Sequence, residues 1–236
     1  LRAKTGGAKL KPEKGLNLPD TALGLSPLTD KDAADLEAVI AIADMIGYSF
    51  VSHAADIDLL ERPDPRTHGL LPFVVNRLKS LRPRIEAAGH QIRFAVTRGP
   101  FNIAAFLMGT AEFMLALRTE PARVHHLLAT VTDFLVDWIA WQRECFPSID
   151  GLLVLDDIVG FVGPKDFETF ALPSLKRVFD ADVTVKAFHN DAPCKACAPY
   201  LAGIGVNLLN FGIQHTVEEM RGWTGGRVTL VGNVPP

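Results

Sequence analysis

The chain has 236 residues, 48% of them hydrophobic, and a formal net charge of −3. Residues 1–236 therefore suffice for a single domain with a sizeable core. The mixed charge pattern excludes a basic surface for nucleic acid, and no apolar stretch is long enough to cross a membrane. Three cysteines are too few for a disulfide framework and are typical of a cytoplasmic protein.

The first part of the chain, residues 1–62, is weakly patterned. Within it, residues 28–47 predict a helix, because apolar residues recur every three or four positions between a capping Thr29 or Asp30 and Gly47. Residues 48–53, "YSFVSH", are a candidate strand.

From residue 70 onward, predicted helices and strands alternate. The predicted helices span residues 70–89, 99–117, 121–146, 163–181, 193–205 and 216–226. The predicted strands span residues 91–98, 151–157, 183–189, 206–212 and 227–233.

The strands read as continuous apolar runs, which indicates a parallel sheet buried on both faces by helices. Two α/β folds have this pattern, the (β/α)8 TIM barrel and the doubly wound sheet. A doubly wound sheet more often carries a glycine-rich phosphate loop after its first strand, and neither GxGxxG nor GxxxxGK occurs here. We therefore expect the barrel. Since five strands and one candidate are fewer than eight, we also expect further βα units outside this sequence.

Polar side chains stand at the carboxyl ends of successive predicted strands, where both folds place their functional groups. They are Thr97, Arg98, Asp156, Asp157, His189, Asn190, Asp191, Asn210 and Asn233. We expect His189, Asp191, Asn210 and either Asp156 or Asp157 to border one cavity.

Five segments, in order and at fitting spacing, resemble the uroporphyrinogen decarboxylase superfamily. They are "GPFNIAAFLMG", "DDIVGFVGPKDFETFALPSLKRVFDA", "FHNDAP", "GVNLLNFG" and "LVGNVPP", and the resemblance runs from about Pro63 to Pro236. It implies a (β/α)8 barrel with an active site at its carboxyl mouth, and a longer chain.

The resemblance implies one of two activities. Cofactor-free decarboxylases of this superfamily carry an N-terminal segment of the type RQAGR, which does not occur in this sequence. Corrinoid-linked methyltransferases bind zinc through a His-x-Cys pair and a later Cys. In this chain His189 matches the His, Asp191 stands at the Cys position, and the later Cys would lie beyond Pro236.

The candidate site residues have alternative interpretations. His189 is either a metal ligand or proton donor, or a rim residue that hydrogen-bonds a loop. Asp191 is either an oxygen ligand or the N-cap of the next helix. Asp156 and Asp157 are adjacent on a strand, so only one can face the mouth and act in catalysis.

The candidate substrate contacts come from four positions. Arg98 is either an anion anchor or half of a salt bridge. Phe101 belongs to the segment "GPFN", which carries the resemblance, and is a further candidate. Asn210 offers neutral hydrogen bonds, while Asn233 either does the same or shapes the turn before the prolines.

Cys194 and Cys197 have CxxC spacing without a second such pair, which cannot complete a zinc site. At i and i+3 of a predicted helix they share a face, and we expect packing there. This spacing also gives poor geometry for a disulfide bond.

Three functions remain open. The first is a methyltransferase that moves a methyl group between a small substrate and a corrinoid on a partner protein, with zinc as Lewis acid. A carboxylate is a harder ligand than a thiolate. A zinc site with Asp191 at the Cys position therefore suits an oxygen substrate, which favours O-demethylation over thiol methylation. The second is a cofactor-free decarboxylase of a porphyrinogen or another carboxylated molecule. The third is a non-catalytic binding barrel. A homodimer is a further expectation.

Overall fold

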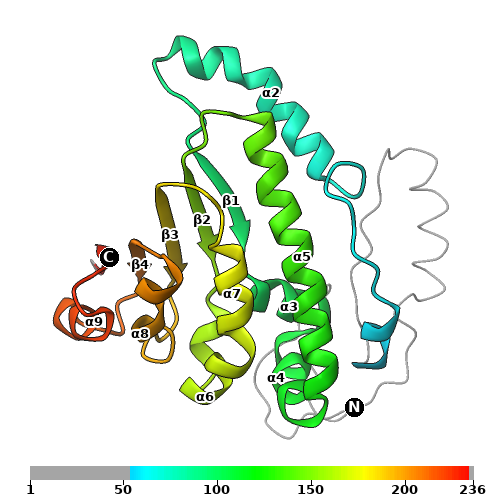
Figure 1. Ribbon diagram of the computed structural model, residues 1–236, viewed down its shortest axis with the longest axis vertical. Coiled ribbons are helices and arrows are strands. Elements are labelled where there is room, and N and C mark those ends of the chain that lie inside the picture. Colours follow the sequence, from blue (N-terminus) through cyan, green and yellow to red (C-terminus); the bar gives the residue numbers. More distant parts are fainter. Residues whose placement is uncertain (1–53, 234–236) are drawn as a thin grey trace, which may run out of the picture. The chain divides into compact units, whose positions relative to one another are not determined.

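The structure is a computed structural model and describes residues 54–233 (Figure 1). The predicted helix at 28–47 and the candidate strand at 48–53 lie outside the described residues. The strands are β1 (Phe94–Arg98), β2 (Gly151–Leu155), β3 (Val185–Asn190), β4 (Leu208–Phe211) and β5 (Thr229–Gly232).

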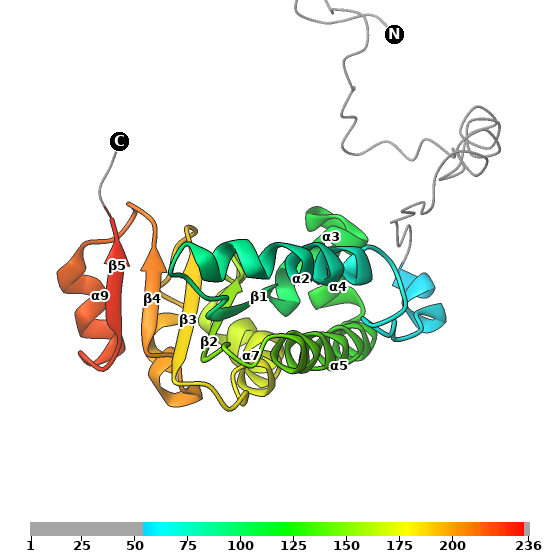
Figure 2. The same ribbon diagram turned by 90° about the horizontal axis from the view of Figure 1, so that it is seen from above.

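The five strands form one sheet in the order β1-β2-β3-β4-β5, and every neighbouring pair is parallel. Figure 2 shows this order across the sheet, with β1 at one edge and β5 at the other. Each strand adds next to the preceding one, so within residues 54–233 the order never reverses. A doubly wound sheet requires such a reversal, and a barrel does not.

Helices connect the strands as the alternating pattern predicts. Short 3-10 helices span Ala54–Leu59, Ile158–Phe161 and Ala202–Ile204, and a π-helical segment spans Phe167–Ala171. The α-helices are α2 (Leu71–Ala87), α3 (Pro100–Met108), α4 (Thr110–Thr119), α5 (Pro121–Cys145), α6 (Pro164–Asp166), α7 (Leu172–Val178), α8 (Ala198–Leu201) and α9 (Val217–Thr224).

The helix predicted over residues 99–117 is divided into α3 and α4. Gly109 has a φ of +86°, a conformation that ends α3 and that side chains with a Cβ rarely adopt. The two helices meet at an angle of 103°. No single helix within residues 54–233 is long and apolar enough to cross a membrane; α3 and α4 reach that length and composition only as a bent pair.

The prediction of one helix over residues 193–205 is wrong in its first turn. Cys194 and Cys197 lie in a turn that precedes α8. The N–H of Cys194 donates to Nε2 of His215, and the N–H of Ala198 donates to the carbonyl of Cys194. These tertiary and local bonds define the turn, so the two thiols do not share the face of a regular helix.

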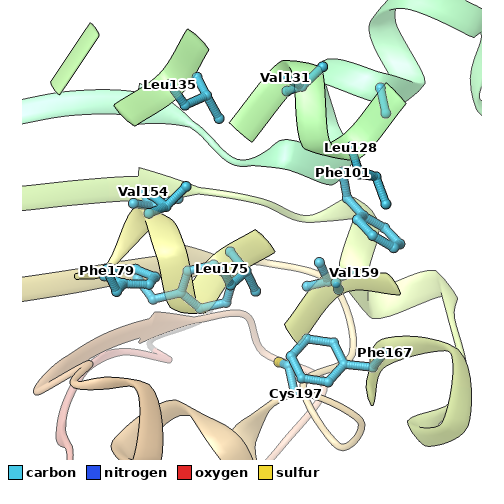
Figure 3. Close-up of a cluster of buried hydrophobic side chains, with 14 of the residues drawn as sticks. Phe101, Leu128, Val131, Leu135, Val154, Val159, Phe167, Leu175, Phe179 and Cys197 are labelled. Carbon is cyan, nitrogen blue, oxygen red and sulfur yellow. The ribbon is translucent and has the colours of Figure 1, made fainter. Parts of the chain in front are cut away.

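Large apolar side chains of the strands and helices form the core, which Figure 3 shows in close-up. Phe188 of β3 packs edge-to-face on Phe179, with ring centroids 6.1 Å apart. Val154 of β2 and Leu175 of α7 are fully buried, as is Phe101 of α3. Burial of each such side chain stabilises the fold by about 1.5–3 kcal/mol.

The expectation that both faces of every strand are buried is wrong for β1 and β5. Exposed and buried residues alternate along β1, where Phe94 is 40% and Val96 is 44% exposed. At the outer edge of β1, the backbone of Val96 nevertheless forms hydrogen bonds with side chains of α5. Its N–H donates to Oε1 of Gln142, and its carbonyl accepts from Nε1 of Trp138. These bonds satisfy edge groups that would otherwise face solvent.

Candidate functional site

One row of residues crosses the carboxyl ends of the strands. The register pairs Arg98 with Leu155, Leu155 with His189, His189 with Asn210, and Asn210 with Val231. Residues paired in this way project to the same face of a parallel sheet. Three of the predicted site residues, Arg98, His189 and Asn210, therefore lie on one face.

His189 is held by the neighbouring strand. Its Nδ1 lies 2.5 Å from Oδ1 of Asn210, whose Nδ2 donates to the carbonyl of Val231 at 2.9 Å. Because a backbone carbonyl can only accept, the amide of Asn210 must turn its oxygen toward His189. His189 then carries a proton on Nδ1, and Nε2 is the nitrogen available for chemistry.

Two carboxylates face the available nitrogen of His189. Nε2 lies 3.5 Å from Oδ2 of Asp191 and 3.8 Å from Oδ1 of Asp157. The same Asp157 oxygen accepts the N–H of Asp191 at 2.8 Å, which ties the loops after β2 and β3 together. The His189 side chain is 23% exposed, so the group is accessible from solvent. This arrangement can donate or accept a proton at Nε2.

Asp156 points to the opposite side of the sheet from Asp157, as the strand geometry predicts. It is fully buried, and its two carboxylate oxygens accept the N–H groups of Phe101 and Asn102 in the first turn of α3. Burial raises the pKa of Asp156 to about 8, while those two N–H donors oppose the shift. A Cβ at Gly99 would collide with the Asp156 carboxylate, which explains the glycine there. The predicted catalytic role of Asp156 is therefore not supported by its position, which is that of a helix cap.

The remaining predicted contacts occupy different surroundings. Arg98 is exposed and lies on the row with His189. Phe101 is fully buried against Phe113, with ring centroids 5.1 Å apart, so it has no surface for a substrate. Asn233 has a φ of +76° and donates to the carbonyls of Gly212 and His215. Asn233 is therefore placed as a residue that shapes a turn, which was the alternative to a substrate contact.

The side chains near His189 do not make a complete metal site. Within residues 54–233, no three His, Cys, Asp or Glu side chains are placed to bind one ion. Zinc sites in proteins use three or four protein ligands, and His189, Asp157 and Asp191 are not placed to bind one ion together. Asp191 is exposed and does not cap α8, which starts seven residues later.

Cys194 and Cys197 are buried free thiols, which confirms the prediction that no disulfide joins them. The hydrogen bond with Cys197, together with burial, raises the pKa of the Cys194 thiol above its usual range. Cys197 accepts from Nδ2 of the buried Asn190. Asn190 and His215 hold this turn, and sequence patterns did not identify either role because both depend on contacts between loops.

We expect iodoacetamide to modify the native protein at the partly exposed Cys145 and to leave Cys194 and Cys197 unmodified. A buried thiol with a raised pKa forms little thiolate, which is the reactive species. Peptide mass mapping checks this result, and all three thiols should react in urea. Modification of Cys194 at the rate of Cys145 in the native protein would contradict it.

Comparison with protein families gives a match over most of the chain. Residues 45–236 match the family model described as uroporphyrinogen decarboxylase (URO-D). The uroporphyrinogen decarboxylase of Picosynechococcus sp. is 27% identical over 195 residues, which cover 77% of this chain and 53% of that protein. The uroporphyrinogen decarboxylase of Myxococcus xanthus is 29% identical over 196 residues, covering 79% and 54%.

A solved structure confirms the fold. A methyltransferase from Methanosarcina mazei superposes with a TM-score of 0.66 at 20% identity, covering 77% of this chain and 54% of that one. The chain thus spans about half the length of the relatives it matches. The sequential parallel sheet and these matches confirm the predicted (β/α)8 barrel class. The chain belongs to the uroporphyrinogen decarboxylase family.

Proposed function

We propose that the protein is a cofactor-independent decarboxylase of a small carboxylated molecule, with His189 as its proton donor. The observation that carries this proposal is the orientation of His189. Asn210 holds Nδ1, and Nε2 faces Asp157 and Asp191 at the carboxyl end of the sheet. The relatives named as uroporphyrinogen decarboxylases support decarboxylation over other reactions of the family.

The chemistry needs a proton donor at this place. When the bond between carbon and the departing carboxylate breaks, CO2 leaves and the electron pair remains on carbon. Nε2–H of His189 donates a proton to that carbon, and the neutral ring then recovers a proton from solvent. Asp157 and Asp191 offer acceptors that orient the protonated ring, which is the usual arrangement for general acid catalysis.

A second candidate is metal-assisted methyl transfer to a corrinoid on a partner protein. The likeness to the methyltransferase from Methanosarcina mazei favours it, as does the position of His189 and Asp191. When bound, zinc would supply Lewis acidity toward the substrate. The donors within residues 54–233 do not complete a zinc site, so this candidate needs a further ligand.

The test compares the two reactions on one preparation of the purified protein. After dialysis against a chelator and elemental analysis for zinc, we expect release of labelled CO2 from a panel of porphyrinogens and small carboxylic acids. We expect no methylation of free cob(I)alamin, followed by its absorbance. Loss of activity on chelation, with recovery on addition of zinc, would overturn the decarboxylase proposal and favour methyl transfer.

A further inference from the structure

Arg98 and His189 lie on the same face of the sheet with one strand between them. Arg98 pairs with Leu155 of β2, and Leu155 pairs with His189 of β3. Neighbouring strands are about 4.8 Å apart, so the two Cα atoms are separated by about 10 Å. One small molecule can therefore reach both side chains across Leu155.

The guanidinium of Arg98 is available to a ligand. Within the described part of the chain it makes no ion pair, whereas Arg93 pairs with Asp150 and Arg118 pairs with Asp166. The charge of Arg98 acts on the buried Asp156, but within the described residues the two side chains form no ion pair, and both Asp156 oxygens accept backbone N–H groups. An exposed arginine with free donors matches the planar geometry of a carboxylate.

The surface next to Arg98 is apolar. Arg98 lines a cavity of about 340 Å³ together with Val96, Leu155, Ile103 and Phe134. Pockets of this kind bind the apolar body of a ligand and use one charged group to orient it.

We infer that Arg98 binds a carboxylate that the substrate keeps through the reaction, with the apolar body of the substrate over Leu155. The ligand class is an amphipathic acid, such as an aromatic or branched carboxylic acid. The assignment of the reacting end to His189 rests on the proposed function, whereas the binding of the retained carboxylate to Arg98 does not.

The test measures binding without turnover. Benzoate and its neutral analogue benzamide are titrated into the purified protein and followed by ligand-observed NMR. The wild type is expected to bind benzoate at least ten-fold more tightly than benzamide. Arg98→Gln is expected to weaken benzoate binding about ten- to hundred-fold and to leave benzamide binding unchanged, since charge-assisted bidentate bonds depend on the guanidinium.

Two control variants separate the outcomes. Arg221→Gln changes an exposed arginine of α9 outside the row and should bind benzoate as the wild type does. His189→Ala should keep benzoate binding. Equal benzoate binding by wild type and Arg98→Gln, or equal affinity of the wild type for both probes, would overturn the inference. Arg98-dependent binding in a protein without decarboxylase activity would support it and reject the proposed function.

Discussion

Replacement of His189 by alanine is expected to lower the rate of turnover by about 10²–10⁴-fold, the usual contribution of a general acid. The variant loses the Nε2 that faces Asp157 and Asp191. The melting temperature should change little, because the lost hydrogen bond to Asn210 contributes about 1 kcal/mol to stability. Turnover and a thermal melt on the same preparation check both parts.

Asn210→Ala is the matched variant for His189→Ala. It keeps the imidazole but removes the acceptor that holds the proton on Nδ1. We expect an intermediate loss of turnover and a mixture of ring tautomers, visible in ¹⁵N NMR of the histidine. If His189→Ala keeps its activity while its melting temperature drops, His189 is a structural rim residue and the proton donor lies elsewhere.

Replacement of Asp156 by alanine is expected to lower the free energy of unfolding by about 2–5 kcal/mol. The change leaves the N–H groups of Phe101 and Asn102 without acceptors in the interior, and it opens a cavity beside Gly99. Asp157→Ala is the matched control, because that neighbouring side chain is 33% exposed. It should cost less than about 1 kcal/mol in stability and should lower turnover. Denaturant unfolding of both variants checks the contrast.

The contribution of Asp156 to the stability of the fold is expected to decrease as the pH rises. Burial raises the pKa of Asp156 to about 8 in the folded protein, above the usual value of about 4 in the unfolded chain. The folded state therefore binds this proton more tightly, and its stabilising contribution is lost as the pH rises through about 8. The stability difference between wild type and Asp156→Ala should be larger at pH 6 than at pH 9. The reverse trend would mean that the two N–H donors outweigh burial.

The two adjacent aspartates, Asp156 and Asp157, contact different parts of the structure. Asp156 joins the end of β2 to the start of α3 by accepting the N–H of Phe101. In the opposite direction, Oδ1 of Asn102 in α3 accepts the N–H of Ile158 in the loop after β2. Asp157 faces His189 instead. We infer that the cap keeps the loop after β2 in place, so that Asp157 remains within reach of the imidazole.

The sequence by itself determined the order of strands and helices, the barrel class and the family. Those features depend on local periodicity, on Gly and Pro at element ends, and on segments such as "FHNDAP". It also placed His189, Asn210 and Arg98 at strand ends and excluded a disulfide between Cys194 and Cys197, because these statements need only spacing and chain direction.

Only the tertiary structure decided which polar groups meet. The register between β3 and β4 brings Asn210 to Nδ1 of His189, and the loop after β2 selects Asp157 over Asp156. Phe101 shares a segment with the candidate site, yet packing against Phe113 places its ring in the core. These outcomes depend on contacts between residues far apart in the chain, and strand alternation shows that the side chains of Asp156 and Asp157 diverge without showing which of them faces His189.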